Sequence, residues 1–232
     1  MKDETLTSRV HLLSIQVGLP QVLTSEELIG TDQTTWTTAF FKQPVAGPIW
    51  IGRTGVAGDG QASSKTHGGP EKAVCVYPLE HYSYWQRELD LPELSYGSFG
   101  ENFTIQGQLE DQSCIGDSIG IGDVVLQISQ PRPPCWRLAR WWQRKDFAVR
   151  MEETGRTGWH CRVIREGFAE AGTTIKLLER PYPEWTISLA NHLLYSDRES
   201  VDQMRGLASC QKLSESWRES LLKRIEKLSA LD

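Results

Sequence analysis

One cysteine of the chain, Cys135, has a sequence environment that could make its thiol reactive. It lies in segment 130–137, which holds three prolines and two arginines between a β-branched apolar run and a helix-compatible stretch. Prolines favour an extended backbone, so Cys135 is expected at the first turn of the helix. A thiolate there would be a nucleophile or a soft-metal ligand, whereas a buried thiol would only pack as a small apolar group. Cations near it in sequence, which would stabilise the thiolate as a helix N-terminus does, are Arg132, Arg137 and Arg140.

A second segment with chemical potential is the loop 65–72, which precedes an apolar strand. Lysines and a histidine flank a Gly-Gly pair in this loop, and such a composition could cradle an anion with backbone N–H groups and charged side chains. The alternative for the histidine is a hydrogen-bonded structural role in a turn. The residues concerned are Lys65, His67, Gly68, Gly69 and Lys72.

Two further glycine-rich loops lie at 52–60 and 97–102, and the latter runs directly into a strand. Glycines at these spacings permit backbone conformations and close approaches that side chains would forbid. Neither loop contains a dinucleotide or nucleotide fingerprint, so we expect no NAD or FAD site.

The charge distribution is uneven. The chain has a net charge of −5, which disfavours general nucleic-acid binding. Between residues 132 and 165, however, nine Lys or Arg residues accompany three acidic ones, a local charge of +6 that leaves −11 for the rest. This cationic segment around Cys135 predicts a small bound anion, for example a phosphate-bearing one, and the alternative is a solvated charged face.

The five cysteines, at 75, 114, 135, 161 and 210, form no C-x-x-C pair. Their number and spacing argue against a disulfide framework, a zinc ribbon and an iron–sulfur cluster. The N-terminal residues lack the apolar segment of a signal peptide, and no apolar run approaches membrane-spanning length. We therefore expect a soluble, cytoplasmic protein that binds neither membranes nor nucleic acid.

Short strands separated by glycine turns, without alternating βαβ units, predict a mainly β fold with a closed or partly closed barrel. We expect this barrel domain to cover 1–180, with its core at about 30–170, and a Pro-Tyr-Pro boundary leads to a three-helix domain at 184–232. Strands are expected at 10–18, 34–41, 49–51, 73–77, 103–105, 124–129, 160–165 and 174–178. Helices are expected at 78–90, 136–145, 147–153, 184–195, 197–206 and 215–230.

Three separated segments together resemble the MOSC domain, and the helical region after the barrel resembles the YiiM branch of that family. The segments are 65–77 (KTHGGPEKAVCVY), 97–104 (GSFGENFT) and 129–138 (SQPRPPCWRL). The resemblance implies a β-barrel that binds the molybdenum cofactor (Mo-molybdopterin), with Cys135 as the metal ligand and His67 as a catalytic proton donor. The other residues that it implies in cofactor binding are Lys65, Gly68, Gly69, Lys72, Gly100, Glu101, Asn102 and Arg132.

The resemblance further implies reduction of N-hydroxylated compounds, such as 6-N-hydroxylaminopurine, to the amine. Electrons must then come from a separate flavoprotein or ferredoxin, because the chain has no cluster-binding cysteines. Two alternatives stay open: sulfur transfer through a persulfide on Cys135, and a carrier that binds the cofactor without turnover.

Overall fold

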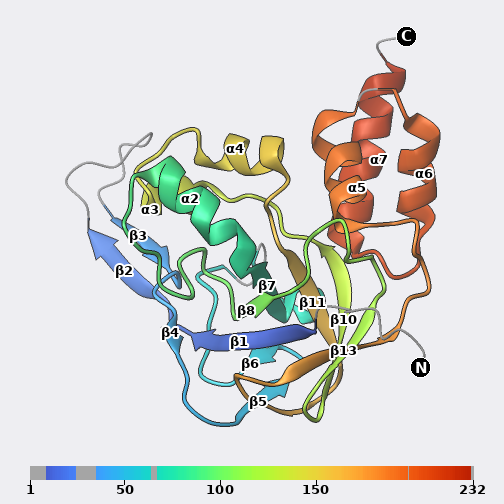
Figure 1. The fold of residues 1–232 in the computed structure, drawn as a ribbon. Helices are drawn as coiled ribbons and strands as arrows, with labels where there is room; N and C mark the ends of the chain where they lie inside the picture. Colours follow the sequence, from blue (N-terminus) through green and yellow to red (C-terminus); the bar gives the residue numbers. More distant parts are fainter. Residues whose placement is uncertain (1–8, 25–34, 64–66, 198, 231–232) are drawn as a thin grey trace, which may run out of the picture.

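The computed structural model describes residues 9–24, 35–63, 67–197 and 199–230, and its centre is a closed, mainly antiparallel barrel (Figure 1). The strand order of the main sheet is β13-β9-β10-β11-β7-β8-β1-β4, and β1 also pairs with β13, which closes seven strands into the barrel. Only β7 and β8 pair in parallel within this sheet as described. The strands are β1 (Val10–Val17), β4 (Gln43–Pro44), β7 (Val74–Pro78), β8 (Phe103–Gln106), β9 (Ser118–Ile121), β10 (Val124–Pro131), β11 (Trp159–Arg165) and β13 (Thr174–Glu179). The predicted mainly β barrel is confirmed.

Two small sheets flank the barrel. One pairs β2 (Gln21–Thr24) with β3 (Thr35–Thr38), and the other joins β5 (Ile49–Gly52), β6 (Gly55–Val56) and β12 (Gly167–Ala169). The strand expected at 34–41 is shorter in the structure, and β2 was not predicted. Because β2 is largely exposed on both faces, its sequence carries no alternation of apolar and polar residues.

Short helices on one side of the barrel enclose a second, aromatic core (Figure 1). These helices are η2 (Leu79–His81), α2 (Tyr82–Leu89), α3 (Trp136–Trp141) and α4 (Phe147–Thr154), and a further short turn, η1 (Pro70–Lys72), lies against β11. Trp85, Phe99 and Phe147 are fully buried here, and the Trp85 and Phe147 rings lie 4.7 Å apart. The aromatic core thus packs α2 and α4 against the loop at 97–100.

The C-terminal helices lie together on another side of the barrel (Figure 1). They are α5 (Ile187–Asn191), the π-helix η3 (His192–Ser196), α6 (Val201–Ser209) and α7 (Glu215–Ser229). Helix α6 was expected to start at residue 197. Instead, the Asp197 carboxylate accepts the N–H groups of Glu199 and Ser200, at 2.7 and 2.9 Å, so it forms a turn before the helix begins.

One continuous apolar core serves both the barrel and these helices. Leu12 and Ile128 of the barrel belong to the same buried cluster as Ile187, Trp217 and Leu221 of the helical region. The cluster therefore packs the helical region against barrel strands that include β10, the strand that leads to Cys135. Among the helices within the described ranges, none combines the length and the apolar character that crossing a bilayer requires.

Candidate functional site

A cavity of about 350 Å³ opens beside Cys135, a size typical of small-ligand sites. Strands β3, β7 and β11, η1, the arm after β10 and the start of α3 contribute to its wall, together with the loops before β4, after β6 and before β8. The charged and imidazole side chains that line it are Lys42, Asp59, His67, Lys72, Arg132, Arg137 and His160. Cations therefore outnumber carboxylates in this lining, as the charge distribution of the sequence predicts.

The Cys135 thiol lies at the point where the extended arm after β10 becomes α3. Its backbone is extended (φ −123°, ψ 138°), it is the N-cap residue of α3, and its Sγ accepts the Arg137 N–H at 3.4 Å. The expected position at the start of a helix is therefore the observed one. Cys135 is half-buried and faces the cavity, whereas the other four cysteines are buried.

The imidazole of His67 lies against this thiol. His67 Nε2 is 3.2 Å from Cys135 Sγ, and His67 Nδ1 is 3.5 Å from Arg137 Nη1. Burial lowers the pKa of His67 to about 4, and the positive charges of Arg137, Arg132 and Lys72 act in the same direction. The ring is therefore neutral at pH 7. Because Arg137 can only donate, Nδ1 is the acceptor, and the ring proton lies on Nε2, which donates to Cys135 Sγ.

Two buried nitrogen atoms without partners in the described part of the chain point to a polar ligand in the cavity, and the guanidinium one favours an anion. Arg132 is 7% exposed; its Nη2 donates to the Phe99 carbonyl, while its Nη1 has no hydrogen-bond partner among the described residues. His160, 9% exposed, likewise has no partner for Nδ1. A buried guanidinium nitrogen left without an acceptor is costly. A phosphate-bearing group would satisfy it, so this part of the cavity fits the cofactor that the resemblance implies.

Lys42 and Asp59 also line the cavity, and the sequence interpretation missed both as site residues. Their side chains are ion-paired, and Asp59 Oδ2 accepts the amide of Asn102 at 2.8 Å, while Oδ1 accepts the Gly18 N–H at 2.8 Å. Asp59 therefore fixes Asn102 beside the cavity. The glycine-rich loop 52–60, which contains Asp59, was the signal that could have identified it.

The predicted site residues of the loop before β8 divide into two groups. Gly100 (φ +74°) and Asn102 line the cavity. Glu101 is fully buried and is not among the lining residues; its carboxylate accepts hydrogen bonds from the loop and from neighbouring side chains. Glu101 thus stabilises the loop through hydrogen bonds to its backbone, on the side away from the cavity. Its role in cofactor binding stays a prediction.

The predicted residues of the loop before β7 also divide. His67 and Lys72 line the cavity, and burial lowers the pKa of Lys72. Gly68 and Gly69 are not among the lining residues, and Lys65 lies outside the described residues. The structure therefore brings His67, Lys72, Gly100, Asn102, Arg132 and Cys135 around one cavity.

The titration of His160 gives a testable prediction. Burial, followed by Arg132, Lys72 and His67, holds the pKa of His160 well below its usual range. An unfolded histidine titrates near 6.5, so the unfolded state binds more protons below that pH, and stability falls as the pH falls. Between pH 7.5 and 5, His160 should account for a loss of about 2 kcal/mol in the cofactor-free chain.

Urea denaturation at several pH values tests this effect. We expect His160→Gln to show a flatter pH dependence of the unfolding free energy than the wild-type chain. His192→Gln is the matched control, because the His192 side chain is 59% exposed. Identical slopes for His160→Gln and wild type would contradict the burial of a neutral His160.

Two family models match the chain in succession. The MOSC domain matches residues 63–176, and the YiiM-like, 3-alpha helix domain matches residues 185–228. The uncharacterized protein YflK of Bacillus subtilis is 38% identical over 98% of this chain and 98% of its own length. Protein YiiM of Escherichia coli is 36% identical over 81% of this chain and 84% of its own length. The resemblance stated from the sequence is confirmed.

Further comparisons agree with this result. A protein named reductase from Gibberella moniliformis is 39% identical over 76% of this chain, which corresponds to 31% of that longer protein. The crystal structure of YiiM from Geobacillus stearothermophilus matches with a TM-score of 0.77 and 35% identity, over 93% of this chain and 99% of that one. YiiM from Escherichia coli matches with a TM-score of 0.71 and 28% identity, over 94% and 92% of the two chains.

Proposed function

Because the chain belongs to the MOSC domain family, in its YiiM-like branch, we propose that it is a molybdenum-cofactor-dependent reductase of N-hydroxylated compounds. The compounds would include bases such as 6-N-hydroxylaminopurine. The observation that carries the proposal is the pairing of Cys135 with the neutral imidazole of His67, at 3.2 Å, in a cation-lined cavity. The Gibberella relative named reductase supports redox chemistry for the family.

The cavity residues suit the parts of this cofactor. A thiolate is a favourable ligand for a soft metal, so Cys135 would bind molybdenum. Arg132 and His160 each carry a buried nitrogen without a partner among the described residues, and with Lys72 they would hold the phosphate. Gly100 and Asn102 would border the pterin.

When bound, the cofactor supplies two-electron redox chemistry for cleavage of the N–O bond. The overall reaction consumes two electrons and two protons, and it yields the amine and water. His67 Nε2–H would donate to the Cys135 sulfur and stabilise its thiolate, because the two atoms are in contact and Nδ1 is the acceptor of Arg137. Burial and the neighbouring cations lower the pKa of His67, and a bound anion would offset the effect of the cations, so that the ring would take up a proton more readily and donate it to the departing hydroxyl group.

The electrons and the substrate would come from outside the chain. The cysteine spacing does not fit an iron–sulfur cluster, so a separate flavoprotein or ferredoxin is the donor that we propose. At the cavity rim, Trp136 is 49% exposed, and the guanidinium groups of Arg137 and Arg140 each lie 4.6 Å from its ring centroid. This exposed aromatic surface suits a flat base.

Elemental analysis and a single assay test the proposal. The chain is purified from a host that makes the cofactor, and molybdenum and oxidised-pterin fluorescence are measured. Reduction of 6-N-hydroxylaminopurine is then followed with reduced methyl viologen as the electron source. We expect near-stoichiometric molybdenum and formation of adenine.

Two other outcomes would replace the proposal. Absence of molybdenum, together with cyanide-releasable sulfur on Cys135, would indicate sulfur transfer. Stoichiometric molybdenum without reduction of any N-hydroxylated base would indicate a cofactor carrier.

A further inference from the structure

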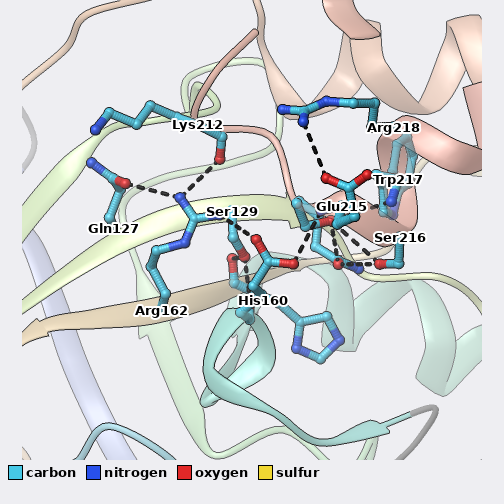
Figure 2. A network of polar contacts seen from close by, with 12 residues as sticks. Gln127, Ser129, His160, Arg162, Lys212, Glu215, Ser216, Trp217 and Arg218 are labelled. Atoms are coloured by element: carbon cyan, nitrogen blue, oxygen red, sulfur yellow. Dashed lines mark hydrogen bonds and ion pairs between the residues drawn. The ribbon is translucent and has the colours of Figure 1, made fainter. Parts of the chain in front are cut away.

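The N-terminus of α7 is hydrogen-bonded to the strand that leads to Cys135. The Ser214 N–H donates to the Ser129 carbonyl at 2.9 Å, and the Ser214 hydroxyl donates to Gln130 Oε1 at 2.7 Å. Ser216 donates to the same oxygen at 3.1 Å, within the network that Figure 2 shows around Ser129 and Glu215. The helical region is thus attached to β10 by polar contacts as well as by the apolar core.

Glu71 connects this network to the cavity wall. Its Oε2 accepts the backbone N–H of Glu215, the first residue of α7, at 3.0 Å, and its Oε1 accepts Arg162 Nη2 at 3.0 Å. The Ser129 hydroxyl donates to the Glu71 carbonyl at 2.6 Å. The positive end of a 15-residue helix favours a carboxylate at this position.

Arg162 extends the connection to the loop before α7. Its Nη1 donates to the Lys212 carbonyl at 2.9 Å and to Gln127 Oε1 at 3.0 Å, as Figure 2 shows. The Glu71 carboxylate therefore bonds to a barrel strand and to the helical region at the same time.

Glu71 directly precedes Lys72, which lines the cavity. Both belong to η1, a single 3-10 turn of three residues, closed by the Lys72 N–H bonded to the Gly69 carbonyl at 3.0 Å. A turn this short has little rigidity of its own. Because Glu71 and Lys72 share this turn, a contact that fixes Glu71 also constrains the backbone of Lys72.

We propose that Glu71 is a positioning residue through which the C-terminal helices fix Lys72 in the anion-binding cavity. The helical region would then determine how close the Lys72 ammonium group lies to an anionic ligand beside Cys135. This coupling concerns the cavity and goes beyond the reaction proposed above, whichever reaction takes place there.

One backbone N–H group can be removed to test the coupling. Glu215 is the first residue of α7, where proline is well tolerated, and Ser214 already has the extended conformation (φ −63°, ψ 150°) that a following proline requires. Glu215→Pro therefore removes the N–H that bonds to Glu71 and keeps the helix. Glu215→Ala is the matched control, because it also lacks the Glu215 carboxylate, which pairs with Arg218, but keeps the N–H.

The Cys135 thiol reports the charge of the cavity in the full-length, cofactor-free chain. Its alkylation rates with anionic iodoacetate and neutral iodoacetamide are measured by peptide mass spectrometry, and their ratio reflects local positive potential. Cationic clefts concentrate anions about tenfold or more, so withdrawal of Lys72 should lower the ratio about threefold in Glu215→Pro relative to Glu215→Ala. Lys72→Met, with the charge absent, should lower the ratio at least as far.

Each outcome of this comparison is informative, provided that the urea midpoints of the two Glu215 variants agree. Equal ratios in Glu215→Pro and Glu215→Ala, or an unchanged ratio in Lys72→Met, would overturn the proposal. Glu71→Gln is the second test. Loss of its negative charge alone would raise the ratio, whereas release of Lys72 would lower it, so a raised ratio would also overturn the proposal.

Discussion

A Cys135→Ala variant is expected to lose both bound molybdenum and the reduction of N-hydroxylated bases. Cys135 is the half-buried thiol of the cavity, and it would be the protein ligand of the metal. Loss of an outer-shell partner typically weakens metal binding about 10- to 100-fold, and loss of the ligand itself should cost at least as much. Elemental analysis of the purified variant measures the first effect, and the reductase assay measures the second.

Cys210→Ala is the control for this experiment. Cys210 is buried between two helices, is not among the residues that line the cavity, and its replacement should leave the molybdenum content unchanged. Full molybdenum occupancy in Cys135→Ala would refute the assignment of Cys135 as the ligand. Full occupancy without activity would instead restrict Cys135 to a role in turnover.

Replacing Glu101 with glutamine is expected to lower the free energy of unfolding by about 3 kcal/mol, because buried donors lose a charged acceptor. The Glu101 carboxylate accepts the N–H groups of Gly97 and Phe99, at 2.9 and 3.0 Å, the Thr104 hydroxyl at 3.0 Å, and the Tyr82 hydroxyl. Burial and the Glu101 charge raise the pKa of Tyr82 far above its usual range, so this phenol stays a donor. Urea denaturation measures the loss.

The matched control is Glu93→Gln, an exposed position before the same loop, which should change stability by less than about 0.5 kcal/mol. The cofactor-binding role predicted for Glu101 gives a different result. In that case the folded Glu101→Gln protein would lose molybdenum out of proportion to its loss of stability. An unchanged urea midpoint would contradict the supporting role.

The sequence predicted those elements whose residues carry a strong local pattern. The β-branched, apolar run at 124–129 predicted a strand, which the structure shows as β10. The helical spacing of Trp217, Leu221 and Ile225 predicted an amphipathic helix, and these residues form the buried face of α7. The predicted start of α6 was wrong because a Ser-Asp-x-Glu pattern is also compatible with an aspartate turn. In the structure the Asp197 carboxylate forms such a turn with the backbone that follows it. Strand β2 escaped prediction because it is largely exposed and pairs only with its neighbour β3 among the described strands.

For the site, prediction succeeded where several residues of one segment carry the signal. The proline arm marked Cys135, and the Gly-Gly loop marked His67, which lies against the Cys135 thiol. Lys42 and His160 could not be found in this way, because only the closed barrel brings their segments to the cavity, whereas the glycine-rich loop 52–60 was a local signal for Asp59. A local pattern also cannot distinguish a residue that lines a cavity from a neighbouring residue that is buried in the protein. Glu101 illustrates this, because it is fully buried and does not line the cavity.

The apolar core shared by the barrel and the C-terminal helices bears on how the protein folds. Two family models divide the chain between residues 176 and 185, yet Ile187 and Trp217 belong to the same buried cluster as Ile128. We therefore expect the two regions to unfold together, because a chain shortened after β13 would expose the apolar surface that these helices cover.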